Sequence, residues 1–247
     1  MNRNKVRRTL IFISLLLFPI TLNYFSPYVS IDGAFNGIIS ASVIVFFLQF
    51  LSGLIFRRAW CSYLCPVAAL SDYTEKINNK PINRKLLRII RYSIFKVWFL
   101  ILISGFVFAG GIKGIDPFHL TENGISVDMP LKYITYYMVL GILFILTLTV
   151  GKRGACHSIC WMSPFISAGA WLGDKLKLPQ LKILSKPEKC IHCAQCDKVC
   201  PMSISVMKDL EQGWIKTQDC IQCAQCVDVC PKSVLSLKVS QQKTIKS

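Results

Sequence analysis

The sequence predicts an α-helical polytopic membrane protein with four transmembrane helices, N-in and C-in, followed by a small α+β domain at the C-terminus. Three observations support this fold class. The 247 residues are 53% hydrophobic and only 17% charged, with a mean hydropathy of +0.46. The apolar residues gather in four long runs. After the last run, eight of the twelve cysteines form a dense repeat.

Each apolar run is near the length of about 20 residues that a helix needs to cross hydrocarbon. The runs cover residues 10–28, 37–56, 93–112 and 131–150. Four basic residues within 3–8 also resemble the start of a secretory signal, but no small-x-small cleavage site follows the first run. We therefore expect an uncleaved span there.

The distribution of basic residues predicts the orientation. Residues 57–91, between the second and third runs, hold eight Lys or Arg, whereas residues 29–36 hold none. The positive-inside rule then places both termini, and with them the cysteine-rich tail, at the cytoplasmic side of the inner membrane. Topology and anionic lipid explain the formal charge of +16. No aromatic–basic recognition motif accompanies the charge, so we expect no nucleic-acid partner.

The tail contains a repeat spaced by 30 residues. CIHCAQCDKVCPMSI (190–204) aligns with CIQCAQCVDVCPKSV (220–234), and 10 of the 15 positions are identical. Each run is C-x2-C-x2-C-x3-C-P, the pattern that binds iron–sulfur clusters in bacterial two-cluster ferredoxins. Zinc sites usually separate two C-x2-C pairs by a longer loop, and disulfides are disfavoured on the reducing side of the membrane. The tail is therefore predicted to be a small α+β ferredoxin-like domain with two 4Fe–4S clusters.

The spacing also predicts which cysteines share a cluster. Three cysteines of one run wrap a cluster, and the fourth is too far along the chain and ligates the other cluster. The first predicted set is Cys190, Cys193, Cys196 and Cys230. The second is Cys220, Cys223, Cys226 and Cys200.

Two further cysteine pairs each follow an apolar run and a basic pair. They are Cys61 with Cys65 and Cys156 with Cys160. If the helices continue through them, the spacing i, i+4 puts both sulfurs of a pair on one face. These four thiols are candidates for an additional metal or cluster site, for a redox-active dithiol, or for a structural or docking role, since free cysteine often packs as a small apolar residue.

Apolar spans, C-x3-C-P near the inner surface and a two-cluster tail resemble the NapH-type membrane ferredoxins, which are quinol dehydrogenase components of periplasmic nitrate reduction. The wider group includes the membrane domains of the nitrous-oxide-reductase regulator type. The resemblance covers nearly the whole chain and implies a protein that moves electrons between the quinone pool and a partner redox protein. The first pair matches as CSYLCP, but the second reads CHSICW, with Trp161 where the family has proline.

The three histidines lie outside the apolar runs, and C-x-x-C-H is absent. We therefore expect no haem, and no glycine pattern indicates a nucleotide or flavin. His119, with Asp116, is a candidate neighbour of a quinone headgroup. His157 lies inside the second pair, and His192 inside the first cluster loop, where it would tune the sulfur environment.

These observations predict a membrane domain at 1–164, an interfacial helix and linker at 165–186, a two-cluster domain at 187–240 and a flexible tail at 241–247. The predicted function is electron relay between quinone, or a cytoplasmic donor, and a partner redox enzyme. The chain would then be an oxidoreductase subunit or a carrier. The alternative is an accessory ferredoxin-type protein for metal reduction or for assembly of another membrane redox enzyme. A regulatory redox sensor ranks last, since no signalling domain is attached.

Overall fold

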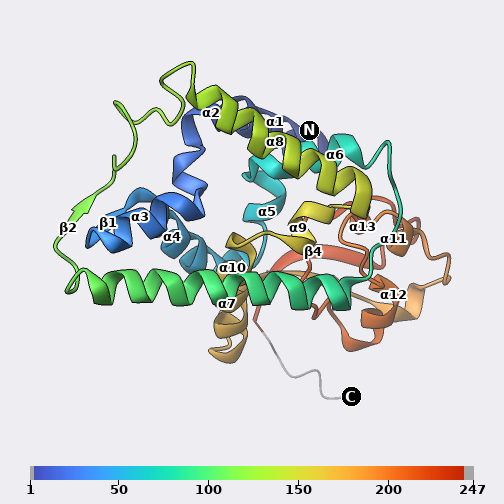
Figure 1. The fold of residues 1–247 in the computed structure, drawn as a ribbon. Helices are drawn as coiled ribbons and strands as arrows, with labels where there is room; N and C mark the ends of the chain where they lie inside the picture. Colours follow the sequence, from blue (N-terminus) through green and yellow to red (C-terminus); the bar gives the residue numbers. More distant parts are fainter. Residues whose placement is uncertain (1–2, 242–247) are drawn as a thin grey trace.

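The computed structural model describes residues 3–241, in a helical part and a compact tail domain packed against one end of it (Figure 1). Beyond residue 241, the predicted flexible tail lies outside the described residues. The helical part contains α1 (Arg3–Leu16), α2 (Phe18–Thr21), η1 (Asn23–Phe25), α3 (Pro27–Phe35), β1 (Ile38–Ser40), α4 (Ala41–Phe56), α5 (Trp60–Tyr63), α6 (Pro66–Thr74), α7 (Arg84–Phe108), β2 (Gly114–Asp116), α8 (Lys132–Val150), α9 (Gly154–Ser158) and α10 (Met162–Lys175). The tail contains β3 (Gln180–Ser185), η2 (Pro187–Lys189), α11 (Gln195–Lys198), α12 (Val206–Asp209), η3 (Leu210–Gln212), α13 (Gln225–Asp228) and β4 (Leu235–Ser240).

The prediction of four transmembrane helices is wrong. Within residues 3–241, one helix, α8, is long and apolar enough to cross a membrane. The other three apolar runs do not form such helices. The fold is a mixed one, helical with two small two-stranded sheets.

Proline and a short strand shorten the first two apolar runs. The first is divided among α1, α2, η1 and α3, and prolines stand in the first turns of α2 and α3. Proline fits the start of a helix but interrupts its interior. In the second run, β1 takes residues 38–40 and pairs in parallel with β2, which leaves 16 residues for α4. A helix of that length extends about 24 Å, less than the ~30 Å of a hydrocarbon core.

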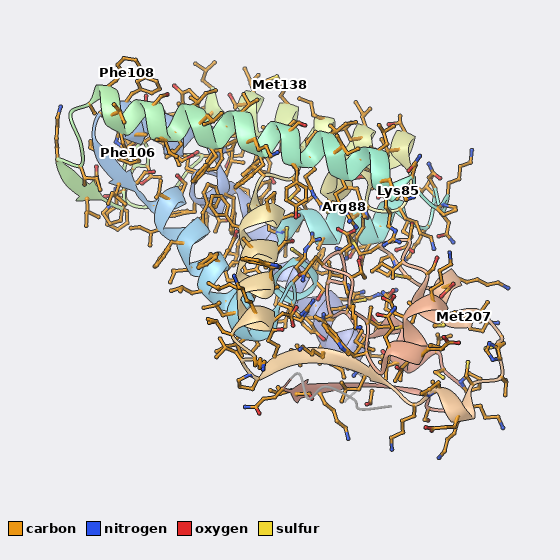
Figure 2. All side chains as sticks on the ribbon, turned by 90° about the horizontal axis from the view of Figure 1, so that it is seen from below. Lys85, Arg88, Phe106, Phe108, Met138 and Met207 are labelled. Atoms are coloured by element: carbon orange, nitrogen blue, oxygen red, sulfur yellow. The ribbon has the colours of Figure 1, made fainter. Side chains whose placement is uncertain are left out.

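Most of the third run lies in α7, which has 25 residues, begins nine residues before the run and ends four residues before the run does. Its first half carries basic side chains and its last half is apolar. Figure 2 shows this polarity, with Lys85 and Arg88 at one end of the helix and Phe106 and Phe108 at the other. The basic end lies next to the tail domain, where Arg88 and Arg91 pair with the carboxylate of Asp219.

Helix α10 contains the start of the predicted interfacial helix, residue 165, and packs along α4. Three glycines allow the two backbones to approach closely. A Cβ on Gly53 would lie 2.5 Å from the carbonyl oxygen of Ile166, and a Cβ on Gly169 would overlap the carbonyl oxygen of Phe50. Gly173 is equally close to the carbonyl of Leu54.

The stretch predicted as a linker contains a strand. β3 pairs antiparallel with β4 in the register Gln180↔Ser240 to Ser185↔Leu235. Gln180 is fully buried, and its amide donates to the carbonyl oxygens of Leu54 and Ala170. The tail domain therefore begins inside the helical part and is fixed to it.

Candidate functional site

The two cysteine runs of the tail repeat each other in backbone conformation as well as in sequence. Equivalent residues adopt positive φ in both runs, in the pairs His192 and Gln222, Ala194 and Ala224, and Ser203 and Ser233. Each run then enters a short helix, α11 or α13, that carries its third cysteine. Left-handed residues curl the backbone tightly, so the cysteines of each run face inward around a small volume.

The first predicted ligand set lines one cavity. Cys190, Cys193, Cys196 and Cys230 surround it with apolar neighbours that include Ile191, Met207 and Leu235. Cys193 is exposed and the other three are half-buried. This site therefore lies at the outer face of the tail domain.

The second predicted set lines a separate cavity on the inner side of the tail. Cys200, Cys220, Cys223 and Cys226 surround it together with core residues such as Ile183 and Ile215. Three of these cysteines are buried, and Cys223 is half-buried. The structure thus brings the eight tail cysteines together in the two predicted groups of four.

The donor set of each cavity fits a 4Fe–4S cluster, which takes four cysteine sulfurs. Each fourth cysteine also accepts a backbone N–H, from Ile204 to the sulfur of Cys200 and from Val234 to the sulfur of Cys230, both at 3.4 Å. Hydrogen bonds of this kind stabilise thiolates and tune cluster potential. Within residues 3–241, no three His, Cys, Asp or Glu side chains form a group that could hold a metal ion. The roles of the eight cysteines as ligands stay a prediction.

The remaining four cysteines lie where the helical part meets the tail. The helices do not continue through the pairs, because α5 ends before Cys65 and α9 ends before Cys160. Cys61 packs against the core of the tail domain. Cys65 and Cys160 belong instead to the core of the helical part. The first pair thus contacts both parts of the molecule.

These four thiols lie close enough to influence one another. Burial, together with the neighbouring thiols of Cys156 and Cys61, raises the pKa of Cys160 to about 12. The pKa of Cys65 is raised well above its ordinary value by burial and by the same group of thiols. Thiols with raised pKa values are poor nucleophiles, which disfavours a redox-active dithiol.

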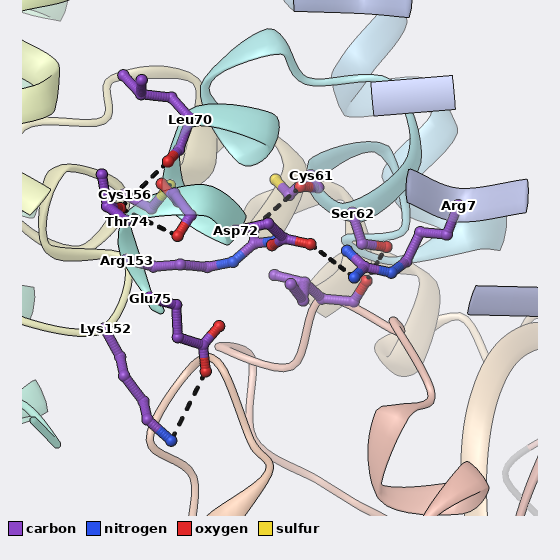
Figure 3. Close-up of polar contacts among 12 residues, drawn as sticks. Arg7, Cys61, Ser62, Leu70, Asp72, Thr74, Glu75, Lys152, Arg153 and Cys156 are labelled. Atoms are coloured by element: carbon purple, nitrogen blue, oxygen red, sulfur yellow. Dashed lines mark hydrogen bonds and ion pairs between the residues drawn. The ribbon is translucent and has the colours of Figure 1, made fainter. Parts of the chain in front are cut away.

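Buried arginines surround these thiols (Figure 3). Asp72 accepts from Arg7 and from Arg153, both at 2.6 Å, so one carboxylate joins α1, α6 and the α8–α9 connection. Burial alone would raise the pKa of Asp72, but the two guanidinium groups lower it below its usual range. Arg153 also donates to the backbone carbonyl of Cys61 at 3.3 Å.

A second carboxylate, Asp219, precedes the first cysteine of the second run. It pairs with Arg91 at 3.1 Å and Arg58 at 3.5 Å, and also with Arg88. Burial opposes its ionisation, yet these arginines hold the pKa of Asp219 well below its ordinary value. Arg58 in turn contacts the thiol of Cys61. This network could not be read from the sequence pattern, because the positive-inside rule alone already accounts for the arginines of residues 57–91.

An apolar cavity of about 330 Å³ adjoins the same cysteines in the helical part. Cys65, Cys156 and Cys160 line one side of it, and α8 contributes Thr135, Val139 and Leu143. The segment from Phe18 to Tyr28 closes another side. This cavity has the volume and lining of a small-molecule pocket.

The three histidines lie in three different environments. His119 does not line this cavity, and its Nε2 lies 2.7 Å from a carboxylate oxygen of Asp32 rather than of Asp116. His157 is buried against the arginines, and burial lowers its pKa to about 3. His192 is exposed in the first cluster loop.

Comparisons with known proteins agree with this site. Residues 189–235 match a 4Fe–4S dicluster domain. Residues 38–87, which contain Cys61 and Cys65, match a second 4Fe–4S binding domain. Two ferredoxin-type 4Fe–4S binding domains are therefore found in this chain. No solved structure matches it.

Curated relatives extend this likeness over most of the chain. It is 28% identical to the putative electron transport protein YccM of Escherichia coli over 73% of its own length and 52% of that protein. It is 25% identical to the methylamine utilization ferredoxin-type protein MauN of Methylorubrum extorquens, over 70% of its length and 59% of MauN. The MauN of Paracoccus denitrificans is 24% identical, over 71% of this chain and 60% of MauN. The chain spans about half to three-fifths of the length of these relatives.

Proposed function

We propose that this chain is a membrane-bound iron–sulfur protein that relays electrons between quinone and a partner redox protein. Two 4Fe–4S clusters would be held in the tail, the outer one by Cys190, Cys193, Cys196 and Cys230, and the inner one by Cys200, Cys220, Cys223 and Cys226. The observation that carries the proposal is the presence of these two tetracysteine cavities within one small core. Each bound cluster would exchange one electron at a time.

The different burial of the two cavities supports a direction for the relay. The inner set lies beside the helical part, since Ser62 of α5 donates to the carbonyl of Ile221 at 2.8 Å. The outer set includes the exposed Cys193. A soluble partner would therefore approach the outer face, and the helical part would exchange electrons with the inner set.

The surface of the helical part supports attachment to a membrane. Large apolar side chains are exposed on several helices, among them Leu16, Phe47, Leu100, Phe108, Ile134 and Ile145. Soluble proteins rarely expose so much contiguous apolar area. Within the inner membrane, the basic residues near the tail would favour the cytoplasmic side.

The 330 Å³ cavity supports quinone as the membrane-side reactant. Its lining is almost entirely apolar, and Thr135 and Asn23 supply the few polar groups that could orient a carbonyl oxygen. A quinol oxidised there would release two electrons and two protons, and each tail cluster would take up one electron.

Iron and acid-labile sulfide per chain, measured on anaerobically purified protein, test the tail assignment. We expect Cys196→Ser and Cys226→Ser each to lose about four iron atoms, the content of one 4Fe–4S cluster. His192→Gln is the matched control, because glutamine stands at the equivalent position 222, and it should retain all iron. Unchanged iron in both cysteine variants would contradict the assignment.

Quinone exchange is tested separately. A water-soluble menaquinol analogue should reduce the clusters, as followed by EPR, and Val139→Trp should block this by filling the cavity. Val97→Trp, at an exposed position on α7, is the control. Dithionite should reduce all variants equally. If Val139→Trp reacts with the quinol as fast as the control, quinone does not use this cavity.

A further inference from the structure

We propose that Cys61, Cys65, Cys156 and Cys160 together hold a third 4Fe–4S cluster, at the junction between the helical part and the tail domain. The site is separate from the two tail sites, and its existence does not depend on which compound delivers electrons.

The fold completes a ligand set that neither segment provides alone. The second 4Fe–4S binding match, residues 38–87, contains only two cysteines of this chain. A 4Fe–4S cluster takes four. In the fold, Cys156 and Cys160 lie near this first pair. Ser71, in the helix α6 that follows Cys65, has its hydroxyl 3.9 Å from the sulfur of Cys156. Three of the four cysteines line the same cavity wall.

Charge at the junction points to an anionic occupant. The largest fully buried side chains include six cations, namely Arg7, Arg57, Arg58, Arg91, Arg153 and Lys182. They share only three carboxylates, Asp72, Asp174 and Asp219. A buried charge without a counter-charge is strongly unfavourable, so this excess requires further negative charge nearby. Neutral thiols provide none, whereas a cluster held by four thiolates does.

Two of these arginines face the thiols directly. Arg58 contacts the sulfur of Cys61 and interacts electrostatically with Cys160. Arg153 interacts with Cys156 and donates to the carbonyl of Cys61. The Nε atom of each guanidinium is buried and has no partner within residues 3–241. Both arginines are therefore fully buried donors with capacity left for an anion between the two cysteine pairs.

The four junction cysteines lie between the apolar cavity of the helical part and the inner cysteine set of the tail. Arg153 acts on Cys156 on one side and on Cys223 of the inner tail set on the other. Cys61 packs directly on the tail core, while Cys65 and Cys160 reach the 330 Å³ cavity. A third cluster here would lie between that cavity and the inner tail cluster.

The test counts iron and maps thiols on the full-length chain, purified and kept under anaerobic conditions. We expect about twelve iron atoms per chain, and about eight in the variant with Cys61, Cys65, Cys156 and Cys160 all replaced by serine. Equal iron in wild type and this variant would overturn the proposal. Because Cys226→Ser removes tail iron only, failure of the tail assignment and failure of the junction site give different results.

A second measurement needs no variant and decides the matter if the quadruple substitution prevents folding. Native protein is treated with iodoacetamide before and after iron chelation under denaturing conditions, and the labelled peptides are identified by mass spectrometry. A junction cluster keeps the four thiols unlabelled until iron is removed, and native mass spectrometry shows the mass of three clusters. A native mass with two clusters, with the four cysteines found as free thiols or as disulfides, would overturn the proposal.

Discussion

The tail cysteines and the junction cysteines form sites of similar composition in opposite ways. In the tail, two contiguous runs supply eight cysteines around one small core of residues such as Met202 and Ile221. At the junction, two pairs more than 90 positions apart are brought together by helices and by buried ion pairs. The tail sites depend on local spacing, and the junction depends on tertiary structure. The two regions should therefore respond differently to perturbation.

The largest effect should come from removing iron. The tail core is small, and four cysteines line each of its two cavities. We therefore expect metal binding and folding of the tail to be coupled. We expect chelation under mild oxidation to unfold the tail, with trypsin then cutting between Lys182 and Lys238, while α4 and α10 stay protected. Resistance of the iron-free tail to trypsin would show that its core is stable alone.

The next largest effect should come from Asp72→Asn, which removes the carboxylate that pairs with two buried arginines at the junction. Arg7 and Arg153 are fully buried, and each would lose its charged partner. Breaking a buried pair in this way costs about 3–5 kcal/mol. We expect a lower melting temperature of the helical part, measured by circular dichroism. Glu211→Gln, at an exposed carboxylate in the tail, is the control and should change little.

The pH dependence of that loss sharpens the test. The two arginines lower the pKa of Asp72 in the folded protein, whereas an unfolded aspartate titrates near ~3.9. Its contribution is therefore complete above that value and is lost only as pH falls through the lower folded pKa. The stability difference between wild type and Asp72→Asn should stay constant from pH 8 to 5. A difference that shrinks within this range would mean that the pKa of Asp72 is raised in the folded protein rather than lowered.

A smaller effect is expected from Gly169→Ala, which tests packing without touching a thiol. The new Cβ would overlap the carbonyl oxygen of Phe50 on α4. Overpacking of this kind costs about 1–3 kcal/mol. Gly141→Ala in α8 is a matched control, because a Cβ there meets no atom within 4 Å. Equal melting temperatures for the two variants would mean that α4 and α10 separate easily.

The smallest effect should follow Arg3→Ala. Arg3 pairs with Asp228 of the tail, but the two side chains are 34% and 40% exposed. Exposed pairs of this kind contribute about 0.2–1 kcal/mol. We expect a small loss of stability in low salt that disappears in high salt, measured by thermal unfolding. A loss as large as that of Asp72→Asn would mean that the surface contact, rather than the buried network, holds the tail in place.

This difference between the regions also explains what could be predicted from sequence. The groups of four tail cysteines were predictable because spacing within a run restricts which sulfurs can meet. The alternation of VLSLKV, residues 234–239, is typical of a strand and coincides closely with β4. The four spans were not a safe prediction, since apolar composition does not show where Pro27 or the pairing of β1 with β2 ends a helix. The buried roles of Arg7, Arg58 and Arg153 depend on contacts between distant segments, which no local pattern records.

The fixed attachment of the tail has a consequence for kinetics. Arg57 pairs with Asp174 at 2.7 Å and lies over the ring of Trp214, while Lys152 donates to the carbonyl of Lys198 at 2.7 Å. These contacts attach the tail to the helical part at two places. Under the proposed relay, electron transfer between the tail and the helical part would then require no diffusive search, so solvent viscosity should slow only the encounter with an outside partner.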